Sequence, residues 1–475
     1  MRYLFLILFC LSSINTYAQE EWLISNIKTE SDFLNPRDII PLVNEDTKDI
    51  VLFFTNRKVV FGKLYNQNKA LIGSINNIKI PKKGKVIIGA IYNNDTYTLF
   101  FSNTNKTHFS SVSINFITNK FNITEDLNIK LDKEKIVEFL VRKNKIHLLT
   151  VSKKNDVLKT LTITEKGVIQ SFEYDLSKEN IVNNIDQDYP LYPLLFGNPS
   201  YSTIEIINNN VPNSLEQTNA ITKLYLNNNT LTITSNLFDK STYIISLDLE
   251  TNTYNFQNII NTGFNESHRG ANSNSFIYND KLLTIYSTLD HLSFSAYNLK
   301  NLTLLKTFQI NKEDKIDFKN TPIIQEGGEF DNYRELEKNS KFLRKITQSK
   351  IGITAYTKND QLIITLGASK EIAGNNFAMV NFGLVGGIAF GLLTNNLYNY
   401  SQTKSTRISC LFDDNLNHIK GHIPLNDFDK IQNFKQDNNA FNNPNLQTLF
   451  KYNSSYLLGN YDKKNGLYSL FKFDF

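Results

Sequence analysis

Short runs of apolar residues recur along the chain, and turns that contain asparagine or aspartate separate many of them. The stretch from Phe276 to Ile310 shows the pattern most fully. It predicts four strands, at Phe276–Tyr278, Lys281–Ser287, Leu292–Tyr297 and Leu302–Ile310. Asn279 and Asp280 suit a tight hairpin, because Asn and Asp tolerate left-handed backbone and hydrogen-bond to their own main chain. We therefore expect a four-stranded antiparallel meander here.

The same order of strand, turn and strand occurs seven times. The first strands of these repeats are predicted at Asp49–Thr55, Ala90–Tyr92, Ile136–Arg142, Ile221–Leu226, Phe276–Tyr278, Ile351–Thr357 and Leu449–Tyr452. Several strands, such as Val51–Phe54, are apolar at consecutive positions, so both faces of their sheet must be covered. Sheets packed face to face around a ring would cover them. The pattern predicts an all-β fold: a seven-bladed β-propeller of four-stranded antiparallel blades.

Third and fourth strands follow in most repeats. In the sixth repeat they are predicted at Thr406–Phe412 and His418–Ile423, whereas in the last repeat only Leu467–Phe475 follows. The last repeat therefore needs a strand from elsewhere in the chain. The N-terminal region Trp22–Ile27 is the natural donor, because a blade shared by both chain ends closes the ring and removes free sheet edges.

Four longer segments interrupt the repeats, at residues 176–220, 312–350, 368–401 and 424–447. The first is predicted as an ordered loop with an extra strand at Tyr201–Ile207, and the last as a polar loop with weak helical character. The segment 312–350 contains the one short helix that we expect, with Asp331 at its start. Its apolar face is predicted from Tyr333, Leu336, Leu343 and Ile346.

The segment 368–401 contains an unusual apolar, Gly-rich stretch, Phe377–Leu393, which has no charged residue. Gly383, Gly387 and Gly391 recur every four residues, a spacing that gives a helix a groove for close helix contact. We therefore name these three glycines as candidate binding residues. Because each Gly costs a soluble helix about 1 kcal/mol relative to Ala, a Gly-rich hairpin or loop is favoured. A protrusion that contacts a membrane or partner protein, and a single membrane span, are the alternatives.

The chain begins like an export signal. Met1 and Arg2 precede the apolar run Tyr3–Leu11, and Thr16–Ala18 is a plausible cleavage site. We expect residues 1–18 to be a signal peptide and residues 19–475 to form a single β-propeller domain, exported to the periplasm or cell surface. Lipidation at Cys10 is disfavoured, because no small residue precedes it. The remaining cysteine, Cys410, lies in an apolar strand and is expected to be a buried thiol.

Composition and motifs exclude several functions. Of the 475 residues, 51 are Lys or Arg and 46 are Asp or Glu, and the basic residues are interspersed, so we expect no nucleic-acid partner. His418 and His422 lie four apart, but on a predicted strand pair and without the Glu of a zinc-protease helix. The turn at Asp413–Asn417 lacks the Gly and Glu of a calcium loop. Nucleophile elbow, phosphate-binding loop and dinucleotide fingerprint are absent from the sequence, so we predict no catalytic residue, metal or cofactor.

The repeats resemble those of exported bacterial β-propeller proteins of unknown function, without the signatures of WD40 or kelch blades. This resemblance implies the fold and no activity. For a propeller without a catalytic constellation, we expect a non-catalytic binding or scaffold protein of the cell envelope. Such a protein would use its face loops and the Phe377–Leu393 insertion to bind an unidentified envelope protein or surface. Two alternatives stay open: an outer-membrane β-barrel, indicated by Phe471, Phe473 and Phe475 at the chain end, and a propeller hydrolase or lyase with acids or Tyr at the channel mouth.

Overall fold

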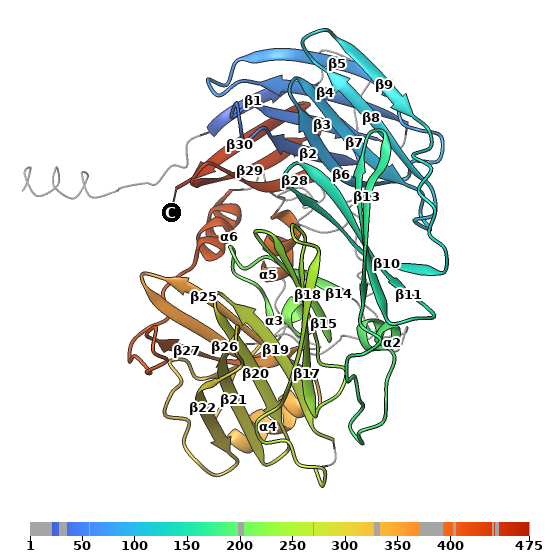
Figure 1. Cartoon of the computed structure of the whole chain (residues 1–475). Helices are drawn as coiled ribbons and strands as arrows, with labels where there is room; N and C mark the ends of the chain where they lie inside the picture. Colours follow the sequence, from blue (N-terminus) through green and yellow to red (C-terminus); the bar gives the residue numbers. More distant parts are fainter. Residues whose placement is uncertain are drawn as a thin grey trace, which may run out of the picture.

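The computed structural model describes residues 21–27, 36–56, 58–197, 204–268, 270–326, 333–369, 393–401, 405–438, 441 and 446–474. Within these ranges the fold is all-β, and its strands β1 to β30 form seven separate sheets of four or five strands. Figure 1 shows the sheets following one another along an arc, from blue and red at the top through cyan and green to yellow and orange at the bottom. Each predicted repeat corresponds to one sheet.

The first three sheets follow the chain without interruption and each has four antiparallel strands. Sheet 1 contains β2 (Asp38–Val43), β3 (Ile50–Thr55), β4 (Val59–Tyr65) and β5 (Leu71–Lys79). Sheet 2 contains β6 (Val86–Asn93), β7 (Thr96–Ser102), β8 (Phe109–Asn115) and β9 (Lys120–Thr124). Sheet 3 contains β10 (Glu134–Arg142), β11 (Lys145–Ser152), β12 (Val157–Thr164) and β13 (Gly167–Asp175).

The next two sheets differ by one strand. Sheet 4 contains β14 (Ile204–Ile207), β15 (Thr222–Asn227), β16 (Thr230–Ser235), β17 (Ser241–Asp248) and β18 (Thr253–Ile260). Sheet 5 contains β19 (Asn272–Tyr278), β20 (Lys281–Ser287), β21 (His291–Asn298) and β22 (Leu304–Asn311). The added strand β14 pairs in parallel with β15, and it confirms part of the extra strand expected before the fourth repeat.

Strands distant in sequence complete the last two sheets. Sheet 6 contains β23 (Ile323–Gln325), β24 (Arg334–Leu336), β25 (Lys350–Lys358), β26 (Gln361–Ser369) and β27 (Ser405–Phe412). Sheet 7 contains β28 (Gln447–Tyr452), β29 (Ser455–Asp462), β30 (Leu467–Phe473) and β1 (Glu21–Asn26). The antiparallel pair of β1 with β30 confirms that the two ends of the chain share one sheet.

Asparagine shapes the hairpin turns as expected. The turn residues with positive φ, between 49° and 55°, include Asn94, Asn144, Asn228, Asn279, Asn359 and Asn453. Each belongs to a hairpin between the first and second strand of its repeat. Asn is the non-glycine residue that most readily occupies this conformation, because its short amide hydrogen-bonds locally. The recurrence of Asn at these turns therefore has a direct backbone cause.

The structure corrects the sixth repeat. The predicted strand His418–Ile423 is wrong: only an isolated bridge joins Phe412 to His418, and the short strand β23 pairs with β27 instead. Asn320 helps to hold this arrangement, since its amide donates to the carbonyl oxygens of Ile419 (2.8 Å) and Gly421 (3.0 Å). The strand β23, which precedes the sixth repeat in the chain, thus pairs with β27 at the position where the sequence predicted a strand that follows β27.

Helices fill the insertions. They are α2 (Leu191–Phe196), α3 (Leu215–Thr218), α4 (Asn339–Thr347), α5 (Thr394–Ser401) and α6 (Asp427–Asp437). The expected helix, α4, buries Leu343 and Ile346, but Leu336 belongs to β24 and Tyr333 is exposed, so the predicted apolar face is wrong in its first half. The expected capping residue Asp331 lies outside the described residues. The helix α6 replaces the predicted polar loop, and a capping box of Asn426 and Asp429 starts it.

In each sheet, the strand that opens the first hairpin is the inner strand. The first repeat is corrected here, because its predicted first strand Asp49–Thr55 is β3, and the inner strand is the preceding β2, which was not predicted. β2 contacts β28, β6 contacts β10, and β19 contacts β25, so these strands meet across sheet boundaries. The fourth strands are exposed along much of their length, as in β9, β13, β18 and β22. Buried apolar clusters lie between neighbouring sheets and cover both faces of each. The two-sided apolar strands of the sequence are explained by this packing.

Helices bridge the junction between sheets 6 and 7. Helix α3 contacts β25, β26 and α5, while α5 contacts β28 and α6. Leu397 of α5 and Phe428 of α6 belong to one apolar cluster with Leu449 and Leu458 of sheet 7. In Figure 1, α5 and α6 lie between the red strands at the top and the orange strands below. The insertions therefore act as packing elements between the last two sheets.

The described strands do not form the single closed sheet that the barrel alternative requires. No helix among the described residues is long and apolar enough to cross a membrane.

Candidate functional site

One position of the repeat is structurally equivalent in all seven sheets. The inner strand and the next strand form a hairpin, and their paired residues can be counted outward from the turn. The position considered is the inner-strand residue of the fifth pair, such as Glu138, which pairs with Leu149. This position, here called the fifth-pair position, is occupied by Ile39, Gly89, Glu138, Lys223, Asn274, Thr354 and Thr448. Equivalent positions on neighbouring inner strands lie at a similar level of the molecule.

Ionisable or amide side chains occupy this position in three consecutive sheets. Glu138 in sheet 3, Lys223 in sheet 4 and Asn274 in sheet 5 have exposed fractions of 8%, 0% and 2%. Buried charged residues are rare because desolvation disfavours the charged form. Two buried ionisable residues and a buried amide at one level of adjacent inner strands therefore mark this region as the candidate site.

Lys223 connects sheet 4 with sheet 5. Its Nζ donates hydrogen bonds to the carbonyl oxygen of Ala220 (2.6 Å) and to Oδ1 of Asn274 (2.5 Å). The amide nitrogen of Asn274 in turn donates to the carbonyl oxygen of Ile351 on β25, at 2.8 Å. The backbone N–H of Ser275 also donates to Oδ1 of Asn274 (2.7 Å). A continuous polar line thus crosses three sheets and fixes the direction of each side chain in it.

Two carboxyl groups lie at the other end of this line. The backbone N–H of Phe139 donates to Oε1 of Glu138 at 2.8 Å. Glu205, on the added strand β14, accepts a hydrogen bond from the side chain of Gln217 in α3 and keeps part of its surface exposed. Because β14 lies on the inner side of β15, it carries Glu205 to the same interior region as Lys223. Figure 1 shows β14 and α3 in the middle of the molecule.

Burial moves the pKa values of all three ionisable groups toward neutrality. Desolvation raises the pKa of Glu138 to about 7, while the Phe139 N–H and Lys106 oppose the rise. Desolvation also raises the pKa of Glu205 to about 7; the charge of Glu138 adds to this rise, and Gln217 and Lys223 oppose it. The pKa of Lys223 is lowered to about 7 by desolvation, against the attraction of Glu205. Groups with pKa values near neutral pH can bind ligands or transfer protons.

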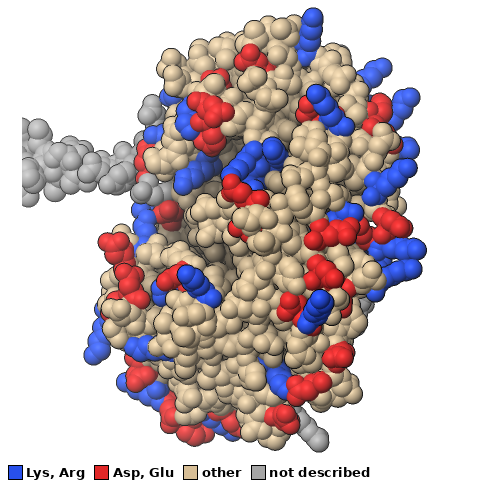
Figure 2. Space-filling view, in the orientation of Figure 1, with Lys and Arg blue, Asp and Glu red and all other residues tan. Residues whose placement is uncertain are grey.

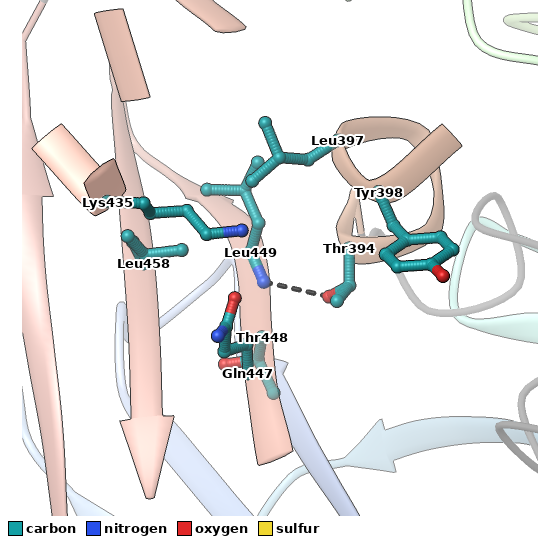
Figure 3. Close-up of a pocket in the computed structure, with 8 residues that line it drawn as sticks. All are labelled: Thr394, Leu397, Tyr398, Lys435, Gln447, Thr448, Leu449 and Leu458. Atoms are coloured by element: carbon teal, nitrogen blue, oxygen red, sulfur yellow. Dashed lines mark hydrogen bonds between the residues drawn. The ribbon is translucent and has the colours of Figure 1, made fainter. Parts of the chain in front are cut away.

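A second polar feature lies at the junction of sheets 6 and 7. Figure 3 shows a pocket between α5, α6 and β28, into which Lys435 points from α6. The backbone N–H of Leu449 donates to Oγ1 of Thr394 at 2.8 Å across one side of it. The cavity volume is about 10 Å³, which is room for roughly one water molecule. This pocket is therefore too small to hold an organic ligand as it stands.

The predicted site residues do not contribute to this region. Gly383, Gly387 and Gly391 lie outside the described residues, so their binding role stays a prediction. His418 donates a hydrogen bond from Nε2 to Oδ1 of Asn320 (3.0 Å), so it belongs to the edge of sheet 6. Cys410 is fully buried, and burial raises the pKa of its thiol, which agrees with an unreactive side chain. In the described part of the chain, no group of three or more His, Cys, Asp or Glu residues could hold a metal ion.

Sequence reasoning missed Glu138, Glu205 and Lys223. A signal was available, since Glu138 interrupts the apolar strand Ile136–Val141 and Lys223 precedes the apolar residues of β15. Lys and Glu are frequent in this chain, however, and a single charged residue in a strand usually faces solvent. Only the packing of the inner strands distinguishes these three residues from the exposed ones.

Surface charge gives no comparable site on the face that is visible in Figure 2. Lys and Arg side chains alternate with Asp and Glu over that face, without one large region of a single sign. The same view shows a hollow between the upper and lower groups of sheets. The interior polar line is thus the best-defined candidate site in the described residues.

No model of a protein family matches the sequence, and no curated protein sequence matches it. Among solved structures, oligogalacturonate lyase in complex with manganese is similar at 8% identity, over 96% of each chain, with a TM-score of 0.31. The β-propeller domain of the trilobed protease from Pyrococcus furiosus is similar at 9% identity, over 70% of this chain and 78% of that one, with a TM-score of 0.27. Similarities with TM-scores this low carry no argument about function.

Dihydro-heme d1 dehydrogenase NirN is similar at 9% identity with a TM-score of 0.25, over 57% of this chain. The matched region spans half of the length of that protein, 50%. The candidate site is therefore interpreted from the geometry of this chain alone.

Proposed function

We propose that this protein is a non-catalytic binding protein of the cell envelope that holds a small polar ligand in its interior, against Glu138, Glu205 and Lys223. The observation that carries the proposal is the convergence of these three ionisable side chains from two neighbouring sheets. A core that served stability alone would gain more from apolar residues at these positions, because buried charges are costly. The free-energy cost of burying these groups is offset if a bound ligand interacts with their charges.

The proposed architecture is a seven-bladed β-propeller in which each sheet is one blade. Inner strands that meet across sheet boundaries, exposed fourth strands and a sheet shared by both chain ends support it. In such a fold, ligands bind around the central channel, where inner strands from several blades meet. The polar residues at the fifth-pair position of sheets 3 to 5 fit that location.

Export through a signal peptide at residues 1–18 is part of the same proposal. Expression of the full chain followed by mass measurement of the mature protein tests it, because cleavage after Ala18 gives a chain that starts at Gln19. Recovery of an intact N-terminus from the cytoplasm would contradict export. The role of Phe377–Leu393 in contacting a membrane or a partner protein stays a prediction, which deletion of that stretch followed by envelope fractionation tests.

Binding is tested with a chemically varied set of small probes: a neutral monosaccharide, a dicarboxylic acid, a primary amine and an amino acid. Ligand-observed NMR compares the natural chain with a variant that carries both Glu138→Gln and Glu205→Gln. This double substitution removes the carboxyl groups at nearly constant volume. Thr354→Val, at the fifth-pair position of sheet 6, is the matched control. We expect at least one probe to bind the natural chain and the control, but not the double variant.

A probe set that binds no better to the natural chain than to the double variant would contradict an interior binding site. Circular dichroism and thermal unfolding of all three proteins check that each is folded. The comparison therefore separates loss of the site from loss of the structure.

A propeller hydrolase or lyase is the second candidate, and the pKa values of the site favour it. A pair of carboxyl groups with pKa values near 7 can act as acid and base at neutral pH. Catalysis is distinguished from binding by following the same probes over time and looking for a new product. Product that forms with the natural chain and is lost in the double variant would replace the binding proposal with an enzymatic one.

A further inference from the structure

The pocket at the junction of sheets 6 and 7 contains a charged group without a partner. Lys435, in the last turn of α6, points its side chain into this pocket (Figure 3). Its ammonium makes no hydrogen bond or ion pair within the residues that the structure describes. A water molecule can accept one of its three N–H donors, but it leaves the positive charge uncompensated. The pocket therefore presents both donors and charge to a ligand.

The surroundings of Lys435 do not compensate its charge. Burial lowers the pKa of the ammonium, and no charged neighbour in the described part of the chain opposes this shift. The carboxyl groups at the start of α6, Asp427 and Asp429, accept hydrogen bonds from other side chains, and Asp437 is exposed. A cation in the last turn suits the helix dipole, but a fully solvated lysine would serve that purpose equally. The dipole therefore does not explain why this lysine enters a pocket.

Thr394 supplies a second donor to the same pocket. It is the first residue of α5, and its Oγ1 accepts the backbone N–H of Leu449 at 2.8 Å. A hydroxyl that accepts a hydrogen bond keeps its own O–H to donate. Figure 3 shows Lys435 and Thr394 on opposite sides of Leu449. Leu397 and Leu458 also line the pocket, and apolar walls strengthen the attraction between an ion and the ammonium.

The size of the pocket restricts the ligand. Its volume of about 10 Å³ is room for roughly one water molecule. A halide ion such as chloride is a single atom of comparable size and fits with a small movement of the Lys435 side chain. A carboxylate, sulfate or phosphate group is several atoms wide and does not fit.

We propose that this pocket is a halide site, which holds one chloride-sized anion between the ammonium of Lys435 and the hydroxyl of Thr394. The site is separate from the interior cluster and goes beyond the proposed function. Because α5 and α6 bridge sheets 6 and 7, a halide bound to both helices favours the assembled junction. Any ligand that binds only the folded chain raises its stability.

The affinity is measured by chloride NMR on the full folded chain, with sodium chloride replacing sodium gluconate at constant sodium concentration. Exchange of chloride with a protein site broadens the chloride signal. We expect Lys435→Met to weaken the affinity about tenfold, because it removes a charge-assisted hydrogen bond at similar side-chain length. Lys430→Met, at an exposed position of the same helix, is the matched control and should keep the affinity of the natural chain. Circular dichroism checks that each protein is folded.

Competing anions and stability give two further measurements. Bromide should displace chloride from the natural chain, whereas sulfate should displace no more chloride there than from Lys435→Met. Chloride should also raise the thermal unfolding midpoint, relative to gluconate, in the natural chain and in Lys430→Met but not in Lys435→Met.

Equal chloride broadening in the natural chain and in Lys435→Met would overturn the site, because chloride would then bind only at exposed basic residues. Sulfate that competes as well as bromide would refute the size-restricted pocket. Diffraction from bromide-soaked crystals of the natural chain locates the ion directly. We expect an anomalous signal in contact with Nζ of Lys435, and bromide positions found only elsewhere would contradict the proposal.

Discussion

The inner strands of sheets 3 to 5 and those of sheets 6, 7, 1 and 2 differ at the fifth-pair position. The first group carries Glu138, Lys223 and Asn274, whereas the second carries Thr354, Thr448, Ile39 and Gly89. Both groups use the same hairpins, the same left-handed Asn turns in most repeats, and apolar packing on both sheet faces. The backbone therefore repeats around the molecule, while ionisable and amide side chains at the fifth-pair position are confined to one side.

The two groups of sheets differ in what their fifth-pair residues need from their surroundings. In the second group, small or apolar side chains satisfy the packing, and Thr354 needs only one hydrogen bond, to the carbonyl oxygen of Asn213 (3.1 Å). In the first group, Lys223 donates a hydrogen bond to Asn274, and Asn274 in turn donates to the carbonyl oxygen of Ile351. Such a connected line is stable only when every member is present.

The largest effect is expected for Asn274→Leu, which breaks the polar line at its centre. Lys223 loses the acceptor Oδ1, and the carbonyl oxygen of Ile351 loses its donor. We expect the free energy of unfolding to fall by about 4 kcal/mol, because a charged donor and a backbone acceptor are both left unpaired in the interior. Urea denaturation followed by circular dichroism measures it. A fall in the free energy of unfolding of only about 0.5 kcal/mol, as for an ordinary surface substitution, would contradict a stabilising role of these hydrogen bonds.

A smaller effect is expected in the pH dependence of stability. The pKa of Glu138 is about 7 in the folded chain against an ordinary value of 4.5, so the folded chain binds more protons between these pH values. Its contribution to stability is complete below pH 4.5 and is lost as the pH rises through 7, by up to about 3 kcal/mol. Glu205 acts in the same direction. Urea denaturation at pH values from 4.5 to 7.5 gives the free energy of unfolding at each pH. This free energy should depend less on pH for Glu138→Gln than for the natural chain.

Lys223 is expected to make stability change with pH in the opposite direction above pH 7. Its pKa is about 7 in the folded chain against an ordinary value of 10.5, so the unfolded chain binds more protons in that range. Stability should rise from pH 7 toward pH 10.5, and the two effects together place a minimum near pH 7. If Glu138→Gln retained the full slope of the natural chain below pH 7, the assignment of that slope to Glu138 would be wrong.

The smallest effect is expected for Thr354→Val, at the equivalent position of sheet 6. The substitution removes one hydrogen bond to the carbonyl oxygen of Asn213 and keeps the shape of the side chain. We expect a loss of about 1 kcal/mol in the free energy of unfolding, measured in the same denaturant series. A loss as large as that of Asn274→Leu would show that the two groups of sheets do not differ in the way proposed.

Much of the fold was predictable because its signals are local. All four strands of the repeat around Phe276–Ile310 were predicted, since a period of apolar strand and Asn turn specifies both the strands and their hairpins. The second strand matches its predicted bounds at both ends, whereas the first begins four residues earlier than predicted, at Asn272. The pairing of β1 with β30 was also predictable, because the last repeat lacked a strand. The sixth repeat was not, because β23 is three residues long and leaves almost no pattern in the sequence.

The sequence by itself determined the all-β class, the number of strand-and-turn repeats and the contact between the chain ends, because each depends on periodicity and on turn residues. Tertiary structure alone decided where the charged residues lie. Glu138, Glu205 and Lys223 look like many other Glu and Lys residues of the chain, and their strands are separated by long segments. Burial and mutual distance are properties of packed sheets, and these properties change the pKa values and create the site.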